Sequence, residues 1–253
     1  MCGRFSLAVA PEVLMQHFGL SVAAEETAVV PRYNIAPSQP VLAVIELGSL
    51  QRKATHFRWG LIPAWSQAAK AGLINARSET VAEKPSFREA FRRRRCLIPA
   101  DGFYEWAERG TAKKGKRPYW FHLVDRPVFA FAGIWERWRS PKGVEVETCA
   151  ILNTAANRLM RLFHERMPAI LTESDYDLWL DPQVQDPKLL LPLLRPYPAE
   201  AMAAYPVSTY VNNPRHEDLT CRAPAGEAVR GADFSALDDS ASPAVAPASL
   251  PIP

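Results

Sequence analysis

A series of short apolar runs, each ended by a turn, constrains the fold of this chain more than any other feature. Residues 40–47 are apolar and rich in branched side chains, a pattern typical of a buried strand. Residues 52–59 alternate between polar and apolar side chains and are expected to pair with that strand. Further strands are predicted at residues 2–8, 96–99, 103–107, 119–124, 128–135, 147–152 and 205–211.

Short helical patterns are scattered between these runs. They are predicted at residues 11–18, with Gly19 as a stop, and at residues 83–95, 155–163, 173–180 and 187–194. The mixture predicts an α+β fold, in which a strand-rich single domain has a curved antiparallel or mixed sheet system that closes toward a barrel, flanked by short helices. We expect the domain to span residues 2–221. Residues 222–253 are rich in Ala, Pro, Ser and Asp without apolar periodicity, which predicts a disordered tail.

Composition limits the classes of protein to which this chain can belong. The chain has 253 residues, 48% of them hydrophobic, and a net charge of +3, which suits one compact and mildly basic domain. Its four cysteines show neither CxxC pairing nor metal-ligand spacing, so we expect free thiols in a reducing compartment and no metal. No membrane-spanning run or signal peptide is apparent. We therefore expect a cytoplasmic protein, monomeric, with no cofactor and no obligate protein partner.

Cys2 is the first candidate for chemistry. A small residue after the initiator Met usually leads to Met removal, which would leave an α-amine and a thiol on one Cα. The amine titrates near ~7.7–8 and the thiol near ~8.5. The amine can form a Schiff base with an aldehyde, and the thiol can close it into a thiazolidine. Cys2 could also attack a carbonyl as an N-terminal nucleophile, or it could simply be a small buried residue on the first strand.

Three polar residues lie in apolar or aromatic segments where a soluble fold does not require them. They are Asn75, Glu105 and His164. Together with a cysteine, these residue types suffice for covalent acid/base chemistry. Each also has a plain structural alternative: Asn75 as a turn residue, Glu105 in a surface ion pair, and His164 as a helix cap.

Basic residues are the second theme of the sequence. Runs occur at 92–95 and 113–117, the latter resembling a loop tip, and single arginines lie beside the candidate segments at Arg4, Arg32, Arg77 and Arg166. Neutralised phosphates supply most sequence-independent affinity for nucleic acid, so arginine near a reactive site fits such a substrate. A solvated helix face is the alternative for the 92–95 run.

Aromatic residues and prolines form the third theme. Trp59 and Trp65 flank a Gly-Leu-Ile-Pro segment, and Pro40 lies upstream. Such residues can stack on an exposed base or wedge between bases, although a tryptophan more commonly packs in the core. Trp65 precedes polar residues and is expected to be the more exposed of the two.

Six motifs occur in order along the chain: Met1-Cys2-Gly3-Arg4-Phe5, Arg32-Tyr33-Asn34-Ile35-Ala36-Pro37, Trp59-Gly60-Leu61-Ile62-Pro63, Asn75-Ala76-Arg77-Ser78-Glu79-Thr80, Pro99-Ala100-Asp101-Gly102-Phe103-Tyr104-Glu105-Trp106 and His164-Glu165-Arg166-Met167-Pro168. Together they closely resemble the SRAP family (SOS response-associated peptidase domain), the abasic-site processing proteins. The resemblance covers roughly residues 2–213.

The resemblance implies capture of an abasic-site aldehyde in single-stranded DNA by Cys2, as a thiazolidine crosslink that protects the lesion during the DNA damage response. It implies that Asn75 holds the sugar or the Cys2 backbone, that Glu105 acts as acid/base, and that His164 helps to open the sugar ring. It also implies phosphate contacts from Arg4, Arg77 and Arg166, and stacking or wedging by Pro40 and Trp65. The family name further implies a peptidase activity that exposes Cys2, and a bacterial member would associate with the nucleoid.

Two other function classes remain open at this stage. An N-terminal-nucleophile amidotransferase also begins Met-Cys-Gly, but this chain contains no Asn-Gly dipeptide for the expected oxyanion motif. A non-covalent module for single-stranded DNA would use the basic and aromatic residues but would not need Cys2 or Glu105.

Overall fold

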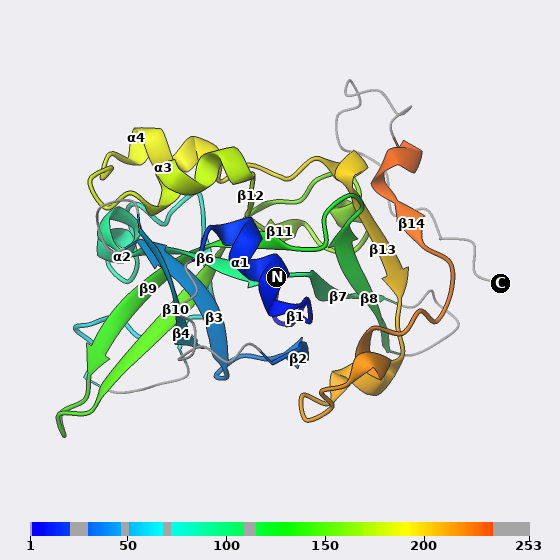
Figure 1. The fold of residues 1–253 in the computed structure, drawn as a ribbon, viewed down its shortest axis with the longest axis horizontal. Helices are drawn as coiled ribbons and strands as arrows, with labels where there is room; N and C mark the ends of the chain where they lie inside the picture. Colours follow the sequence, from blue (N-terminus) through cyan, green and yellow to red (C-terminus); the bar gives the residue numbers. More distant parts are fainter. Residues whose placement is uncertain (1, 21–29, 47–50, 68–71, 109–114, 235–253) are drawn as a thin grey trace.

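The computed structural model describes residues 2–20, 30–46, 51–67, 72–108 and 115–234 (Figure 1). Its helices are α1 (Pro11–Phe18), α2 (Arg88–Arg93), α3 (Tyr176–Leu180) and α4 (Pro187–Leu190). Its strands are β1 (Phe5–Leu7), β2 (Arg32–Ile35), β3 (Pro40–Glu46), β4 (Arg52–Trp59), β5 (Asn75–Arg77), β6 (Arg95–Ala100), β7 (Gly102–Glu108), β8 (Lys116–Leu123), β9 (Phe129–Arg139), β10 (Glu145–Ala155), β11 (Arg166–Pro168), β12 (Ile170–Leu171), β13 (Met202–Pro206) and β14 (Val229–Arg230).

These strands form two sheets that lie side by side in Figure 1. One runs β14-β13-β8-β7-β1-β2, and the other runs β11-β10-β4-β3-β6-β9-β12 with β5 added on β10. The second sheet curls, because β10 pairs with β9 as well as with β4. The predicted strand-rich α+β class is confirmed, but the strands form two sheets and not a closed barrel.

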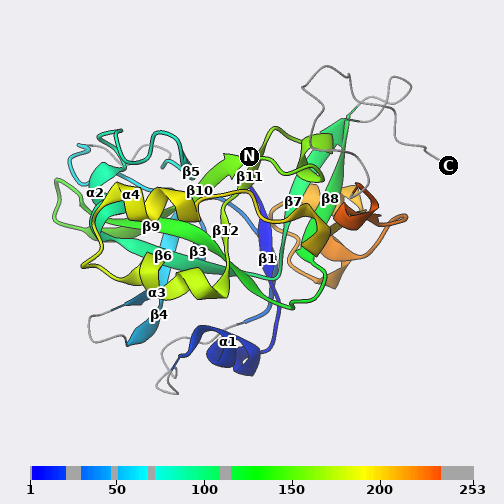
Figure 2. The same cartoon turned by 90° about the horizontal axis from the view of Figure 1, so that it is seen from above.

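Phe5 joins the two sheets in one core. Its ring meets Trp59 edge-on at 5.2 Å and Phe131 at 5.7 Å, both from the second sheet. All three side chains are fully buried, and burying each contributes about 1.5–3 kcal/mol. Figure 2 shows β1, a strand of the first sheet, near the middle of the molecule, with α3 and α4 over the second sheet, where α3 packs against β6. The start of the chain is thereby fixed at the centre of the molecule.

Several predicted elements form as the sequence indicates. Helix α1 has the predicted bounds and ends at Gly19, whose φ of 62° is the left-handed conformation that glycine adopts without strain. Strands β3 and β4 pair antiparallel from Pro40 opposite Arg58 to Glu46 opposite Arg52. The predicted helices at 173–180 and 187–194 are also present, partly as 3-10 turns.

The helix predicted at residues 83–95 is shorter than expected. It forms only over α2, since Pro85 lacks an amide hydrogen and disfavours helical backbone at the residue before it. Arg95 leaves the helix and begins β6, where its buried guanidinium donates to backbone oxygens.

The helix predicted at residues 155–163 and the strand predicted at 205–211 are wrong in most of their length. Ala155 ends β10, because it pairs with Arg166 of β11, and only residues 160–162 form a single 3-10 turn. At the second site, β13 ends at Pro206. Ser208 then caps the 3-10 turn Thr209–Asn212 by accepting from the Tyr210 amide.

The disordered tail predicted from residue 222 does not hold for residues 222–234. Residues 222–234 pack on the domain: β14 pairs with β13, and the Arg222 guanidinium lies 2.8 Å from the Asp101 carboxylate. The remainder of the predicted tail, 235–253, and the first two residues of the 113–117 run lie outside the described residues. No helix among the described residues is long and apolar enough to cross a membrane.

Candidate active site at the N-terminal cysteine

Cys2 lies three residues before the start of β1 and is only 1% exposed. Its thiol faces the backbone oxygen of Arg4 at 3.8 Å. Burial, followed by the negative charge of Glu105, raises the pKa of the Cys2 thiol to about 12. The thiol is therefore protonated at neutral pH, and any reaction that uses the sulfur must also remove its proton.

Asn75 holds the Cys2 backbone. Strand β5 pairs in parallel with β10, with Asn75 opposite Ile151, and the Asn75 Nδ2 donates to the Cys2 carbonyl oxygen at 2.8 Å. The Asn75 Oδ1 is buried and has no hydrogen-bond partner among the described residues. An unpaired buried acceptor costs about 1–3 kcal/mol, which makes it a ready contact for a bound donor.

Glu105 faces the interior from β7. Residues two apart on a strand share a face, so Glu105 lies on the same face as Phe103, whose ring is 6.0 Å from Phe131 of the other sheet. Glu105 is 8% exposed, and its charge acts on the Cys2 thiol. Its Oε1 accepts from the Trp106 amide at 3.3 Å.

His164 is held in one tautomer by its neighbour. Its Nδ1 accepts from the Arg166 amide at 2.9 Å, so the neutral imidazole carries its proton on Nε2. The adjacent Phe163 packs against Tyr119 at 4.7 Å, and Tyr119 of β8 lies opposite Glu105 in the register. The His164 segment therefore lies over the strand next to Glu105.

Arg166, predicted to grip a phosphate, is already bonded within the protein. It donates to both carboxylate oxygens of Glu79, at 2.7 and 2.8 Å. It also donates to the Asn153 Oδ1 at 2.7 Å through Nη2 and at 3.1 Å through Nε. These bonds lower the pKa of Glu79, chiefly through the hydrogen bond from Arg166. Asn153 is fully buried, and its Nδ2 has no partner among the described residues.

The other two predicted phosphate contacts differ from each other. Arg77 is exposed and lies on the same face of β5 as Asn75, two residues away. Arg4 is half-buried; its Nη1 donates to the Asn34 Oδ1 at 2.7 Å and to the Val211 backbone oxygen at 2.8 Å. Burial lowers the pKa of Arg4. Of the two, Arg77 is the more open to a ligand.

Trp65 and Pro40 are exposed, as their predicted contacts with DNA require. Trp65 is 66% exposed, and Pro40 begins β3. The Trp138 Nε1 fixes the loop after Trp65 by donating to the Ser66 backbone oxygen at 2.7 Å. Trp59 is fully buried, and its Nε1 donates to the Ile74 backbone oxygen at 2.9 Å, which anchors the residue before Asn75.

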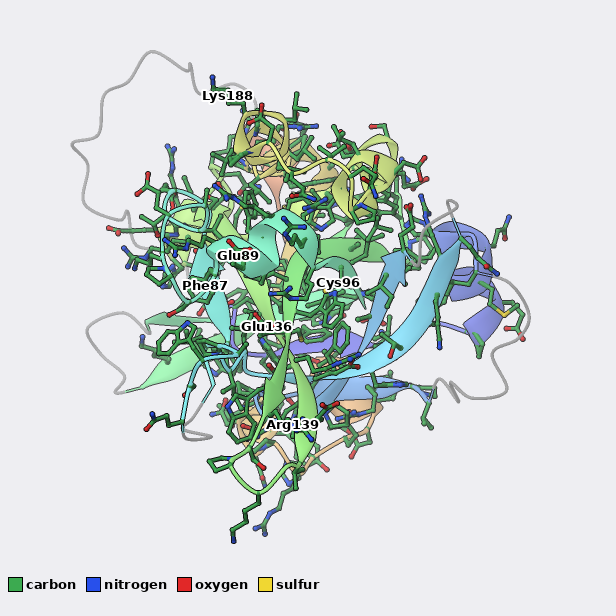
Figure 3. All side chains as sticks on the ribbon, turned by 90° about the vertical axis from the view of Figure 1, so that its left-hand side faces the viewer. Phe87, Glu89, Cys96, Glu136, Arg139 and Lys188 are labelled. Carbon is green, nitrogen blue, oxygen red and sulfur yellow. The ribbon has the colours of Figure 1, made fainter. Side chains whose placement is uncertain are left out.

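The 92–95 run is divided between surface and core. Arg95 is 4% exposed and donates to backbone oxygens of α2 and of the segment after α3, so it supports the fold. Arg94 pairs with Glu136 at 2.7 Å, which links the end of α2 to the β9–β10 hairpin. Figure 3 shows Glu136 and Arg139 along this hairpin, with Glu89 of α2 beside it.

Sequence reasoning missed three polar residues of this region. Asn153, Asn34 and Glu79 each bond one of the predicted arginines. A buried asparagine within the apolar strand β10 was the one signal available, because such a residue needs a polar partner. Among the described residues, no three His, Cys, Asp or Glu side chains gather as a metal site would require.

Together, the fold and this geometry define a candidate site built on Cys2, with the Asn75 amide bonded to its backbone and the Glu105 charge acting on its thiol. The model of the family SRAP, SOS response associated peptidase, matches residues 1–214. The chain belongs to this family.

Relatives of known name and solved structure agree with this membership. The abasic site processing protein YoqW of Bacillus subtilis is 44% identical over 218 residues, covering 85% of this chain and 96% of that protein. The abasic site processing protein HMCES of Gallus gallus is 32% identical, covering 77% of this chain and 66% of its own length. A crystal structure of a protein from Bacteroides thetaiotaomicron, 29% identical, superposes with a TM-score of 0.77 over 88% of this chain and 100% of its own.

Proposed function

We propose that this protein captures the aldehyde of an abasic site in single-stranded DNA through Cys2, as a thiazolidine crosslink that shields the lesion. One observation carries the proposal: the Cys2 carbonyl is held by Asn75 at 2.8 Å while Glu105 acts electrostatically on the Cys2 thiol. Family membership and the names of the relatives agree with such a substrate.

The chemistry requires removal of Met1, because an amide nitrogen cannot form an imine. The free Cys2 amine then attacks the open-chain aldehyde, and water leaves as the C=N bond forms. Next the sulfur attacks the imine carbon. A C–S bond forms, the thiol loses its proton, and the nitrogen gains one. The same cysteine, as a nucleophile toward the Met1–Cys2 peptide bond, would account for the peptidase activity in the family name.

The residues around Cys2 have different roles in this reaction. Because the thiol pKa is raised to about 12, ring closure needs a base, and Glu105 can take the thiol proton and deliver it to the nitrogen. His164, with its proton on Nε2, can donate to the ring oxygen as the sugar opens. The unpaired Asn75 Oδ1 and Asn153 Nδ2 can accept from and donate to the sugar or its phosphate.

Three exposed residues would contact the DNA. Arg77 offers a charge to a phosphate, and Trp65 offers a ring on which a base can stack, a contact worth about 1–3 kcal/mol. Pro40 can wedge beside the lesion. Arg4 and Arg166 carry charge near the strand while bonded to Asn34, Glu79 and Asn153, and so contribute chiefly through their fields.

A gel assay with defined N-termini tests this proposal. Three proteins, beginning at Cys2, beginning at Met1, and carrying Cys2→Ser with a free N-terminus, are incubated with an abasic single-stranded oligonucleotide and run under denaturing conditions. We expect a heat-stable adduct only for the first. The Ser variant should give an adduct only when borohydride traps its imine. Full, undiminished protection of the lesion by the Ser variant would instead favour a non-covalent DNA-binding module.

A further inference from the structure

The segment 209–222 wraps against the strands that carry the site. It contains the 3-10 turns Thr209–Asn212 and Leu219–Arg222 and continues past residue 214, where the family match ends. Figure 1 shows it in orange beside β2. The fully buried Asn34 of β2 shares the two hydrogens of its Nδ2 among three backbone oxygens of this segment, those of Val211, Asn213 and His216, at 3.2, 3.0 and 2.8 Å.

Glu217 takes the place of a neighbouring strand at the edge of the sheet. Strand β2 is the last strand of its sheet, so its outer amides need another acceptor. The Glu217 Oε1 accepts from the amides of Tyr33 and Asn34 at 2.5 and 2.8 Å. Its Oε2 accepts from the Arg32 Nε at 3.0 Å. One carboxylate thereby joins the segment to β2 through three donors.

The same segment reaches a neighbour of each reacting group. Toward the cysteine, the Arg4 Nη1 bonds both Asn34 and the Val211 oxygen, and Arg4 is two residues from Cys2. Toward the carboxylate, the Trp106 Nε1 donates to the Asn212 Oδ1 at 2.8 Å, and Trp106 follows Glu105. Arg4 also lies 5.8 Å from the centre of the Trp106 ring.

From these contacts we infer that the 209–222 segment positions Cys2 against Glu105, with Glu217 as the principal positioning residue. In its relation to catalysis, the inference rests on the proposed function. Glu217 touches neither Cys2 nor Glu105; it acts by holding Asn34, which fixes Arg4 and so the backbone that leads into β1. Loss of the Glu217 charge should make the backbone around Cys2 more mobile. The buried side chains of the second sheet should remain packed.

Thiol alkylation tests the positioning without any DNA. Glu217→Gln keeps the size of the side chain but removes its charge, and Glu227→Gln, an exposed site outside the segment, is the matched control. Alkylation by iodoacetamide is mapped by mass at Cys2 and at Cys149, which is fully buried in the other sheet. We expect Glu217→Gln to speed alkylation of Cys2 about tenfold, with Cys149 and the control unchanged. Equal acceleration at both cysteines, or none at Cys2, would overturn the inference.

A second measurement connects the segment to the reaction. With abasic single-stranded DNA, misplacement of the sulfur should slow ring closure more than imine formation. Glu217→Gln should therefore raise the ratio of borohydride-trapped imine to heat-stable adduct about tenfold. Asn212→Ala, which removes only the exposed bond to Trp106, serves as a milder variant should Glu217→Gln fold poorly. Absence of any adduct from the parent protein would reject the proposed function, whereas an unchanged ratio would reject the role of the segment in catalysis.

Discussion

The side-chain amide of Asn75 holds the backbone carbonyl of Cys2 at 2.8 Å, so a residue of β5 fixes the nucleophile that precedes β1. The bond leaves the Asn75 Oδ1 buried and unpaired among the described residues. One side chain thus combines a positioning contact to the protein with an open acceptor at the site. Most of the chemistry proposed for Cys2 depends on this pairing.

Asn75→Asp should slow formation of the heat-stable adduct without unfolding the protein. The carboxylate has nearly the same shape, but it cannot donate to the Cys2 oxygen and it adds negative charge next to Cys2, whose thiol already experiences the charge of Glu105. Loss of a hydrogen bond worth about 1 kcal/mol corresponds to roughly fivefold in rate, and the added repulsion increases the loss. The rate is measured by quenched time points on a denaturing gel. The control Gln183→Glu makes an equivalent change at an exposed position and should react at the parent rate. If its rate of adduct formation falls as much as that of Asn75→Asp, the effect is not specific to Asn75.

His164→Gln should slow the reaction with an abasic site but spare the reaction with a small open-chain aldehyde. The imidazole presents an Nε2 proton because its Nδ1 accepts from the Arg166 amide, and ring opening of the closed sugar is the step that needs this proton. General acid catalysis is typically worth about 10²–10⁴-fold. Thiazolidine formation is followed by mass with each aldehyde. If both reactions slow equally, His164 acts elsewhere in the mechanism.

The pH dependence of the crosslink should follow the amine and not the thiol. Burial and Glu105 raise the pKa of the Cys2 thiol to about 12, so thiolate is scarce below pH 10. The rate should rise as the free amine deprotonates near ~7.7–8 and then level off. A continued tenfold rise per pH unit through pH 9–10 would show that thiolate limits the reaction.

The same pKa shift has a consequence for stability. The folded thiol has a pKa above the unfolded value of ~8.5, so folding favours its protonated form. This contribution is complete below about pH 8.5 and is lost as the pH rises toward the folded pKa of about 12. Cys2→Ala should therefore lose less stability than the parent protein between pH 8.5 and 11, as measured by urea unfolding. Parallel curves for the two proteins would show that the buried thiol is not the group responsible.

Glu79→Gln should strengthen binding to single-stranded DNA by releasing Arg166. The two carboxylate oxygens now occupy the guanidinium at 2.7 and 2.8 Å. A freed arginine adds about one phosphate contact and steepens the salt dependence accordingly. Fluorescence anisotropy at several salt concentrations measures both effects.

The matched control for this change is Glu89→Gln, since Glu89 pairs with Arg93 on the exposed face of α2. It alters the net charge equally but frees no residue at the site. Equal gains from both variants would assign the effect to net charge alone. The Glu79 carboxylate has a lowered pKa owing chiefly to Arg166, so the difference between parent and Glu79→Gln should shrink as the pH falls below ~4.5 and through that lowered pKa.

The sequence predicts local structure correctly where the residues of a single segment are sufficient to set its conformation. Gly19 ends α1, the branched run of β3 pairs with β4, and Trp59 packs in the core, because periodicity and backbone preference within each segment suffice. Helix α2 and the 3-10 turn at 160–162 fall short of their predicted lengths because a proline in one case and a strand partner in the other override local preference.

The site could be predicted by residue type but not by its supporting bonds. Cys2, Asn75 and Glu105 stand out as polar or reactive residues in apolar settings, and the fold brings them together. The bonds that engage Arg4 and Arg166 join residues far apart in the chain, and no local pattern encodes them. For the same reason, the contacts of Glu217 with β2 emerge only from the folded arrangement.

Intact-protein mass after reaction with an abasic single-stranded oligonucleotide tests the central claim most directly. The protein begins at Cys2, the abasic site is made by uracil glycosylase, and no borohydride is added. The account predicts one heat-stable adduct per chain, with a mass equal to protein plus oligonucleotide minus one water, absent from Cys2→Ala. A correctly processed protein that forms no adduct, or one whose adduct persists in Cys2→Ala, would contradict it.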